Sequence, residues 1–293
     1  MKRKTTVLAL GVLILTGICY ADGFFNRISL RGYGGYAKVG FDDYNTIIAG
    51  QEQYMDDWLL PLGLNRWGNL EKIESGFTFG GDLLVGLTKN FYLTLGVGSR
   101  SYGKKTDAAW AQAVAGRLTI TVEPSFCITS LTLGVSAFFP LSSKVDFYAR
   151  AAPGMYWADG EFDFRQDLEF ITFEGWALSQ NTAKGHGIGF EGGVGLEFMF
   201  SRKVGFFVEG GGYLVRIGEL RGDWMYEDSD GISESVTDAK IWFFEVTDDG
   251  VEYYPTFGYA DSQPAGAEIR NVRPFRLNVS GLAAKVGIVV RFR

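Results

Sequence analysis

The single histidine, His186, is where acid–base or nucleophilic chemistry in this 293-residue chain would start. Ser179 and Glu191 flank it, and a serine, a histidine and a carboxylate are the groups that acyl-transfer enzymes bring together. Catalysis needs these side chains within hydrogen-bonding distance, which proximity in sequence does not supply. The surrounding KGHGIGF is ordinary for a histidine at the exposed end of a strand. We therefore predict no catalytic residues and no cofactor.

In several segments apolar and polar residues alternate, and charged residues occupy the polar positions, so they would share one face of a strand. Isolated charges in a dry interior are costly, whereas paired and hydrogen-bonded charges are tolerated. Acids and bases on this face are about equal in number, which favours a salt-bridged core over a narrow ion path, because a selective path would favour one sign. The predicted charge network consists of Arg31, Asp82, Arg100, Asp146, Arg150, Glu191, Glu197, Glu209, Lys285 and Arg291.

Seven tryptophans form another group of candidates, and all lie in or beside the long connections between the predicted strands. Tryptophan is enriched in the aromatic belts of membrane proteins and at binding hot spots. We interpret these side chains as an outer girdle with small loop cores, and keep open a surface for an extracellular partner or an apolar ligand. The predicted surface-loop aromatics are Trp58, Trp67, Trp110, Trp176, Trp224 and Trp242, with Trp157 at the edge of its connection.

No metal site is predicted. The acidic run at 227–231 could attract a divalent cation, but it lacks the full ligand spacing of a calcium loop. Cys127 is the only cysteine outside the N-terminal segment, so no internal disulfide is expected there. We interpret Cys127 as an inert, small apolar residue.

Strands with period-two alternation position these residues. In the stretch 76–102, odd-numbered apolar residues continue across a short turn at 88–90. This parity predicts a hairpin in which Leu87 faces Phe91 and Val85 faces Leu93. Two further hairpins follow the same rule, around turns at 140–144 and 201–203. Upstream of Pro124 the apolar parity reverses, for which we predict a β-bulge at that proline.

The chemistry of the two faces indicates which one is inside. The polar face is mostly glycine, threonine and serine, which suits the crowded interior of a narrow barrel, whereas the aliphatic and aromatic face suits lipid. We therefore predict one domain over 22–293, an all-β, up-and-down antiparallel transmembrane β-barrel of eight strands.

Three short turns and four long connections join the eight predicted strands, and the long connections are expected to be extracellular loops over 42–75, 103–116, 158–185 and 219–274. The last has a net charge of −9 and contains two β-type runs around Asp249-Gly250. These runs would either stand above the membrane or make a ten-stranded barrel. We prefer the former, because Glu245 and Glu252 would interrupt a lipid-facing side.

The N-terminal residues predict export. Lys2, Arg3 and Lys4 precede an apolar run that leads to Ala21, which has the form of a signal peptide over 1–21. The apolar run is only about a dozen residues long, whereas a membrane helix needs about 20, and no other segment is uniformly apolar for that length. Any spanning must therefore be done by strands. Loss of the segment takes the formal net charge from −6 to −9, and an acidic chain without a basic run argues against nucleic-acid binding.

The signal segment, the alternation, the uneven connections and a last strand reading VGIVVRFR resemble the eight-stranded outer-membrane barrel superfamily of the OmpA, OmpX and OmpW kind. Arg293 after Phe292 departs from the family's aromatic-ended final strand. The resemblance implies both termini in the periplasm, recognition by the barrel insertion machinery, and contact with outer-membrane lipid and lipopolysaccharide. Some members modify lipid A with a histidine, a serine and a carboxylate, but the residues around His186 do not look like their motifs.

The function expected from these features is non-enzymatic. We predict an outer-membrane barrel with a plugged polar interior that serves as a structural or surface-interaction protein through acidic, tryptophan-bearing loops. One alternative is a transporter of small apolar molecules, as in the OmpW-like relatives. The other is a lipid A-modifying enzyme at His186.

Overall fold

The structure is a computed structural model that describes residues 28–112, 116–170, 173–247 and 253–292. The predicted signal peptide at 1–21 and the turn at Asp249-Gly250 lie outside these residues. No helix within the described ranges is long and apolar enough to cross a membrane.

The described residues form one helix and fourteen strands of a single antiparallel sheet. In chain order the elements are β1 (Ile28–Val39), α2 (Asp42–Leu59), β2 (Asn65–Gly68), β3 (Ser75–Gly86), β4 (Phe91–Gly103), β5 (Thr106–Gln112), β6 (Gly116–Pro140), β7 (Val145–Phe170), β8 (Phe173–Met199), β9 (Val204–Asp228), β10 (Ser233–Val246), β11 (Tyr254–Tyr259), β12 (Ile269–Pro274), β13 (Leu277–Asn278) and β14 (Gly281–Phe292).

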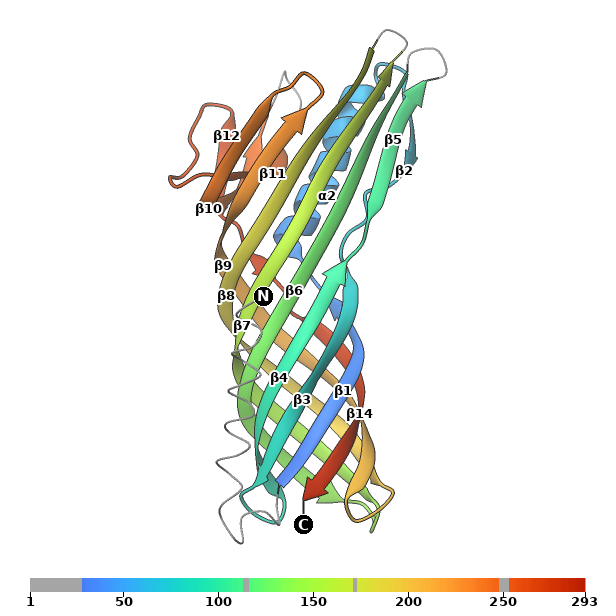
Figure 1. The fold of residues 1–293 in the computed structure, drawn as a ribbon, viewed down its shortest axis with the longest axis vertical. Helices are drawn as coiled ribbons and strands as arrows, with labels where there is room; N and C mark the ends of the chain where they lie inside the picture. Colours follow the sequence, from blue (N-terminus) through green and yellow to red (C-terminus); the bar gives the residue numbers. More distant parts are fainter. Residues whose placement is uncertain (1–27, 113–115, 171–172, 248–252, 293) are drawn as a thin grey trace.

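Eight of the strands close into a ring (Figure 1). β1 pairs with β3 and β14, and the circuit continues through β4, β6, β7, β8 and β9 back to β14. Ile28 pairs with Phe292, so the two ends of the described chain lie together, at the end of the ring that carries the short turns. The predicted count of eight is confirmed, because β10 and β11 lie outside the circuit and the ten-stranded alternative is wrong.

The three predicted hairpins have the expected registers. Val85 pairs with Leu93, and the amide of Leu87 donates to the carbonyl of Phe91 at 2.8 Å. The β6–β7 and β8–β9 hairpins close in the same way around residues 141–144 and 200–203. Parity conserved across a short turn was therefore sufficient to fix which residues face each other.

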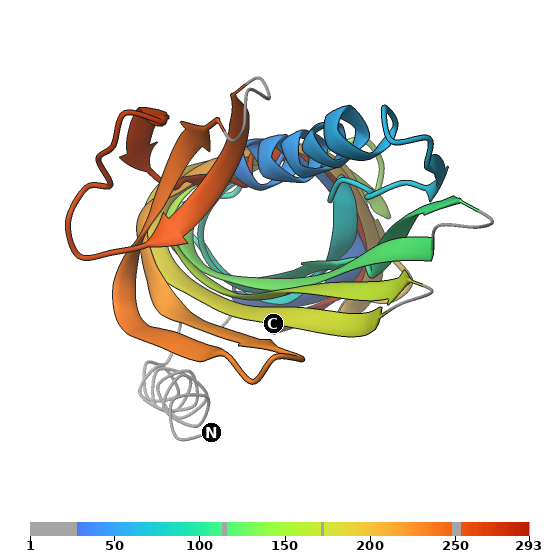
Figure 2. The same cartoon turned by 90° about the horizontal axis from the view of Figure 1, so that it is seen from above.

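The four connections predicted as loops are instead folded, which corrects the sequence interpretation. The connection 42–75 contains α2 and β2, 103–116 contains β5, and 219–274 contains β10, β11 and β12. In the connection 158–185, residues 158–170 and 173–185 are the outer parts of β7 and β8, which pair with each other. We call these parts, with the outer portions of β6 to β9 and with β13, the cap. Figure 2 shows α2 lying across the open side of the curved cap sheet.

The β-bulge predicted at Pro124 is also wrong. β6 pairs with β7 from Gly116 to Pro140 without a register shift, and its even-numbered side chains point inward along the whole strand. The apolar parity reverses because the apolar residues change faces, not because the backbone slips. Register shifts occur elsewhere: β10 has shifts at Val236/Ala239 and Phe243/Glu245, and between β8 and β9 the register shifts at Lys184/His186, where Glu219 adopts a φ of 52°.

Helix α2 follows from a spacing that the strand interpretation overlooked. Its buried residues Tyr44, Ile47, Ile48, Met55 and Leu59 recur at intervals of three, four and seven, as on one face of a helix. Two aspartates in the first turn suit the positive end of the helix dipole. A segment with this pattern packs its apolar face into the cap and leaves Asp42 and Asp57 exposed.

Candidate functional site

The interior of the ring holds the charged residues predicted from parity. All ten take part in ion pairs, five bases with five acids. Most of these pairs join strands that are two or three positions apart in the ring, so they cross the interior. The side chains therefore fill the interior instead of lining an open channel.

Arg150 of β7 is the centre of the larger of two charge clusters. Its guanidinium lies 3.0 Å from Asp82 on β3, 3.1 Å from Glu191 on β8 and 3.4 Å from Glu209 on β9. Arg100 adds a contact with Glu191 at 2.8 Å. Lys285 approaches the carboxylates of Glu191 and Glu209 at 3.5 and 3.4 Å, which brings the cluster to three bases and three acids. These side chains are nearly inaccessible to solvent, so each charge depends on its partners for stability.

The second cluster lies nearer the short turns. Arg31 pairs with Glu197, which also contacts Arg291, and Arg291 lies 2.7 Å from Asp146. Tyr148 connects the two clusters, because its ring lies 4.1 Å from the Arg31 guanidinium carbon and its hydroxyl donates to Glu209 at 3.0 Å. The clusters are therefore stacked along the axis of the ring.

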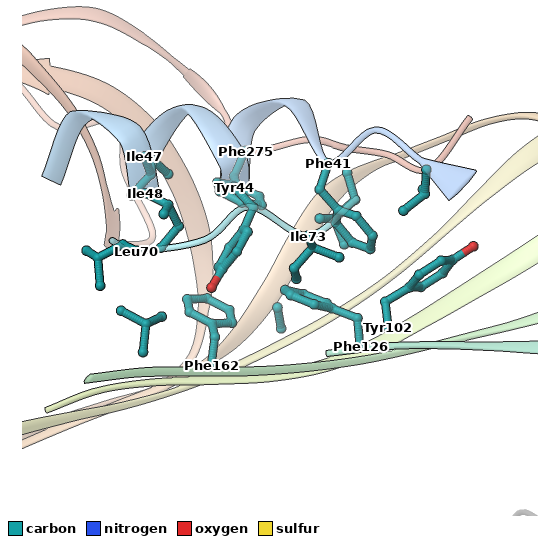
Figure 3. Packing of buried hydrophobic residues seen from close by; sticks show 14 of the residues in the cluster. Phe41, Tyr44, Ile47, Ile48, Leu70, Ile73, Tyr102, Phe126, Phe162 and Phe275 are labelled. Atoms are coloured by element: carbon teal, nitrogen blue, oxygen red, sulfur yellow. The ribbon is translucent and has the colours of Figure 1, made fainter. Parts of the chain in front are cut away.

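An aromatic layer covers the charge clusters on the cap side (Figure 3). Phe41 lies 5.2 Å from Tyr102 and 5.1 Å from Phe126 between ring centroids. Tyr102 shares a hydrogen bond with Tyr213 at 3.1 Å, and the guanidinium carbon of Arg100 lies 4.4 Å from the Tyr213 ring. The sequence analysis missed this layer, although inward parity at Tyr102 and Phe126 could have indicated it. The interior is thus closed twice, by ion pairs and by packed aromatic rings.

Two carboxylates fasten α2 over this layer. Asp43 forms a bidentate pair with Arg273 and accepts the backbone amide of Arg276 at 2.8 Å. At the other end of the helix, Asp56 accepts the indole N–H of Trp110 at 2.8 Å. Burial raises the pKa of Tyr44 above its ordinary value, so this hydroxyl stays neutral within the core. The helix is therefore a fixed part of the cap.

The outer face of the ring is apolar. On β6 and β7 the outward residues between the short turn and the cap are Leu131, Leu133, Val135, Ala137 and Phe139, and Val145, Phe147, Ala149, Ala151, Pro153, Met155 and Trp157. Further along the same faces, Thr119, Thr121 and Glu123 replace them on β6, and Asp159, Glu161 and Asp163 replace them on β7. The outer surface changes chemistry where the ring meets the cap.

The tryptophans do not form one surface class, which corrects the prediction for two of them. Trp110 is fully buried in the cap core, and Trp242 is buried against β11, with its indole N–H donating to the carbonyl of Ala260. Trp58 and Trp67 are exposed, at 52% and 58%. Trp157 is also exposed, whereas Trp176 and Trp224 are half-buried.

The three residues considered for acyl transfer do not meet. His186 points outward from β8, while Glu191 of the same strand points into the ring and pairs with Arg100. Ser179 accepts the indole N–H of Trp224 at 2.9 Å. His186 and Glu191 are held on opposite faces of one strand, so they do not form a triad.

Two other sequence candidates have simple structural positions. In the run 227–231, Asp228 accepts backbone amides of Asp230 and Ile232, and no cluster of three or more possible metal-ligating side chains occurs among the described residues. Cys127 lies on the outer face of β6, 3.4 Å from the Ser99 hydroxyl.

No protein-family model and no curated protein matches the chain.

Proposed function

We propose that the eight-stranded ring is a transmembrane β-barrel of a bacterial outer membrane, and that the protein acts without catalysis as a plugged structural and surface-interaction module. The reversal of polarity along single strands is the observation that supports this proposal. In the cap, inward residues such as Leu118 and Ile120 are apolar and outward residues are polar. In the ring, outward residues are apolar, and inward ones are small or charged except for an aromatic cluster around Phe138, Tyr148 and Phe207. Lipid around the ring and water around the cap account for both halves.

The length of the apolar band agrees with this proposal. On β7 the outward apolar residues run from Val145 to Trp157, and a tilted strand needs about 9–11 residues to cross the hydrocarbon. The closed circuit leaves no unpaired strand edge within the band, as lipid requires. We propose that the short turns face the periplasm and that the cap stands outside the cell.

The cap offers a surface for a partner. Trp58, Leu60, Leu62 and Trp67 are all exposed, around the C-terminal end of α2 and the edge strand β2. Exposed aromatic and aliphatic side chains next to one another are typical of protein contacts. We propose that this end of the cap is the interaction surface, and that the plugged ring serves as its membrane anchor.

A transporter of small apolar molecules remains the second candidate, because a groove opens on the outside where β3 begins and β4 ends. The groove has a volume of about 750 Å³ and is lined by Tyr36, Phe77 and Tyr102 together with polar residues. In the proposed orientation it would lie beside the lipid, where an apolar solute could leave the barrel wall.

Cell fractionation combined with gel migration tests the proposal. The exported protein should be recovered in the outer membrane and should migrate differently before and after boiling, because a closed barrel resists detergent. Recovery as a soluble periplasmic protein would contradict the proposal. Epitope tags at 230–231 and at 202–203 test orientation: only the first should be labelled on intact cells.

Planar bilayers distinguish the plug from the transporter. The paired charges and the aromatic layer should prevent stable ion-channel openings. Openings of porin size would show that the interior empties, and uptake of an apolar solute that depends on Phe77 would favour the second candidate.

A further inference from the structure

A group of basic side chains lies just beyond the apolar band on two neighbouring strands. On β8 the outward series continues from Phe190 and Ile188 to His186 and Lys184, and on β9 it continues from Leu214 to Arg216. Ile188 and Leu214 are 79% and 69% exposed, among the most exposed aliphatic side chains described. The basic residues therefore begin where the most exposed part of the band ends.

Strand register places these bases together. His186 pairs with Gly218 and Ile188 pairs with Arg216, so His186 and Arg216 are diagonal neighbours across one outer surface. Diagonal neighbours lie roughly 7–8 Å apart, within reach of long side chains. On the other side of β8, His186 pairs with Trp157, an exposed tryptophan at the end of the β7 apolar series. Tryptophan prefers the boundary between lipid and water, which independently marks the level of these bases.

Lys184, His186 and Arg216 form no ion pair with any residue in the described ranges. The nearest acidic residues are Asp159, which stands opposite Lys184 in the register of β7 and β8, and Glu219, which is close to Arg216 in sequence.

Several other bases around the exit of the ring are neutralised by ion pairs, although Lys38 and Lys72 form none within the described ranges. Lys104 pairs with Glu71 and Lys105 pairs with Glu123 at 2.7 Å, and Arg221 pairs with Asp238 and Asp261. In an acidic chain, three neighbouring unpaired bases at the edge of an apolar band indicate an anionic partner at that edge.

We propose that Lys184, His186 and Arg216 bind the phosphate groups of a phosphorylated glycolipid of the outer leaflet, whose acyl chains lie against Ile188, Phe190 and Leu214. This assignment rests on the proposed membrane orientation. Guanidinium and ammonium groups form charge-assisted hydrogen bonds with phosphate oxygens, and the glycine at 218 leaves the surface between them without a side chain. A lipid satisfies both halves of the surface, whereas a soluble anion satisfies only the basic half.

Binding of fluorescent bisphosphorylated lipid A to the mature protein in phosphatidylcholine nanodiscs tests the assignment. The triple variant Lys184→Gln, His186→Gln, Arg216→Gln should bind about tenfold more weakly or worse, since each base near an anionic surface is worth several-fold in affinity. The double variant Lys104→Gln, Lys105→Gln is the matched control and should lose less than about twofold, because its bases are already paired with carboxylates. If the triple variant does not fold, Arg216→Gln alone should weaken binding by about threefold to fivefold.

Three outcomes would overturn the assignment: equal binding by the triple variant and the parent, an equal loss in the matched control, or displacement of lipid A by millimolar inorganic phosphate. Migration before and after boiling is measured on every variant. If the parent protein itself fails to insert, the proposed function fails; if it inserts and the triple variant still binds lipid A normally, only this assignment fails.

Discussion

The ring and the cap are built from the same strands with opposite polarity. On β6, Leu131 and Leu133 point outward in the ring, whereas Ile120 and Val122 point inward in the cap. The backbone between them is continuous, and its register with β7 does not shift. Pairing thus determines the direction of each side chain, and under the proposed membrane orientation the surrounding medium determines which direction is apolar. A water-filled environment around the whole molecule would leave the ring with a large exposed apolar belt.

The two regions also differ in what holds their interiors together. The ring interior depends on paired charges, and the cap interior depends on apolar burial around Phe126 and Trp110. A buried pair becomes strongly destabilising when one partner is removed, because the other charge stays buried. Loss of one contact in the cap core instead leaves a cavity. The comparison therefore predicts different weak points in the two regions.

Replacing Arg150 should have the largest effect. Arg150→Met leaves Asp82, Glu191 and Glu209 with fewer partners, and we expect a loss of about 3–5 kcal/mol in the free energy of unfolding. Urea unfolding in detergent, followed by gel migration, measures it. Arg165→Met on the same strand is the control, since its contact with Asp167 at 2.8 Å is exposed and should be worth less than about 1 kcal/mol. Similar losses in both variants would contradict a buried ionic plug.

Introducing a charge on the outer face should separate the two regions directly. Leu133→Lys puts an ammonium into the proposed lipid belt and should cost about 2–4 kcal/mol. Thr119→Lys lies on the same face of the same strand, in the cap, opposite Asp167, and should change stability by less than about 0.5 kcal/mol. Refolding into lipid vesicles measures both. Equal effects would mean that the two outer faces meet the same medium.

Sequence analysis predicted the ring well because its strands alternate cleanly and its turns are short. The pairing of Val85 with Leu93 and the position of Arg150 both follow from parity alone. The inverted alternation of the cap was noticed at Leu118 and Ile120, where it was interpreted as a bulge at Pro124 and not as a change in which face is apolar. The other cap segments were taken for loops. The helix was missed because its apolar spacing was read against a strand pattern.

The interior contacts could be predicted only as a set. Parity placed all ten charged residues on one face, but it could not show that Arg150 reaches Asp82 across the ring, since that depends on the closure of the circuit. The aromatic layer depends similarly on α2 folding back over the opening. Phe41 and Phe126 are far apart in sequence, and no local pattern relates them.

Removing the carboxylate that anchors α2 should affect the cap and spare the ring. Asp43→Ala removes the partner of Arg273 and of the Arg276 amide, with an expected local loss of about 1–3 kcal/mol. Amide hydrogen exchange should rise along α2, while migration before and after boiling stays unchanged. Asp57→Ala, an exposed change on the same helix, should leave exchange as in the parent. Loss of the ring in Asp43→Ala would show that the two regions fold as one unit.

The smallest expected effect concerns the bulge on β9, where the cap departs from the ring. Glu219 has a φ of 52°, which costs a non-glycine residue about 1–2 kcal/mol. Glycine removes this strain but loses about 0.5–1 kcal/mol through its greater freedom in the unfolded chain. Glu219→Gly should therefore be neutral or slightly stabilising.

The control is Glu161→Gly, at an extended outward position of β7, which should be destabilising by about 0.5–1 kcal/mol. Thermal unfolding of the two variants under the same conditions measures the difference, and a larger loss for Glu219→Gly would mean that its side chain, and not the backbone bend, stabilises the junction.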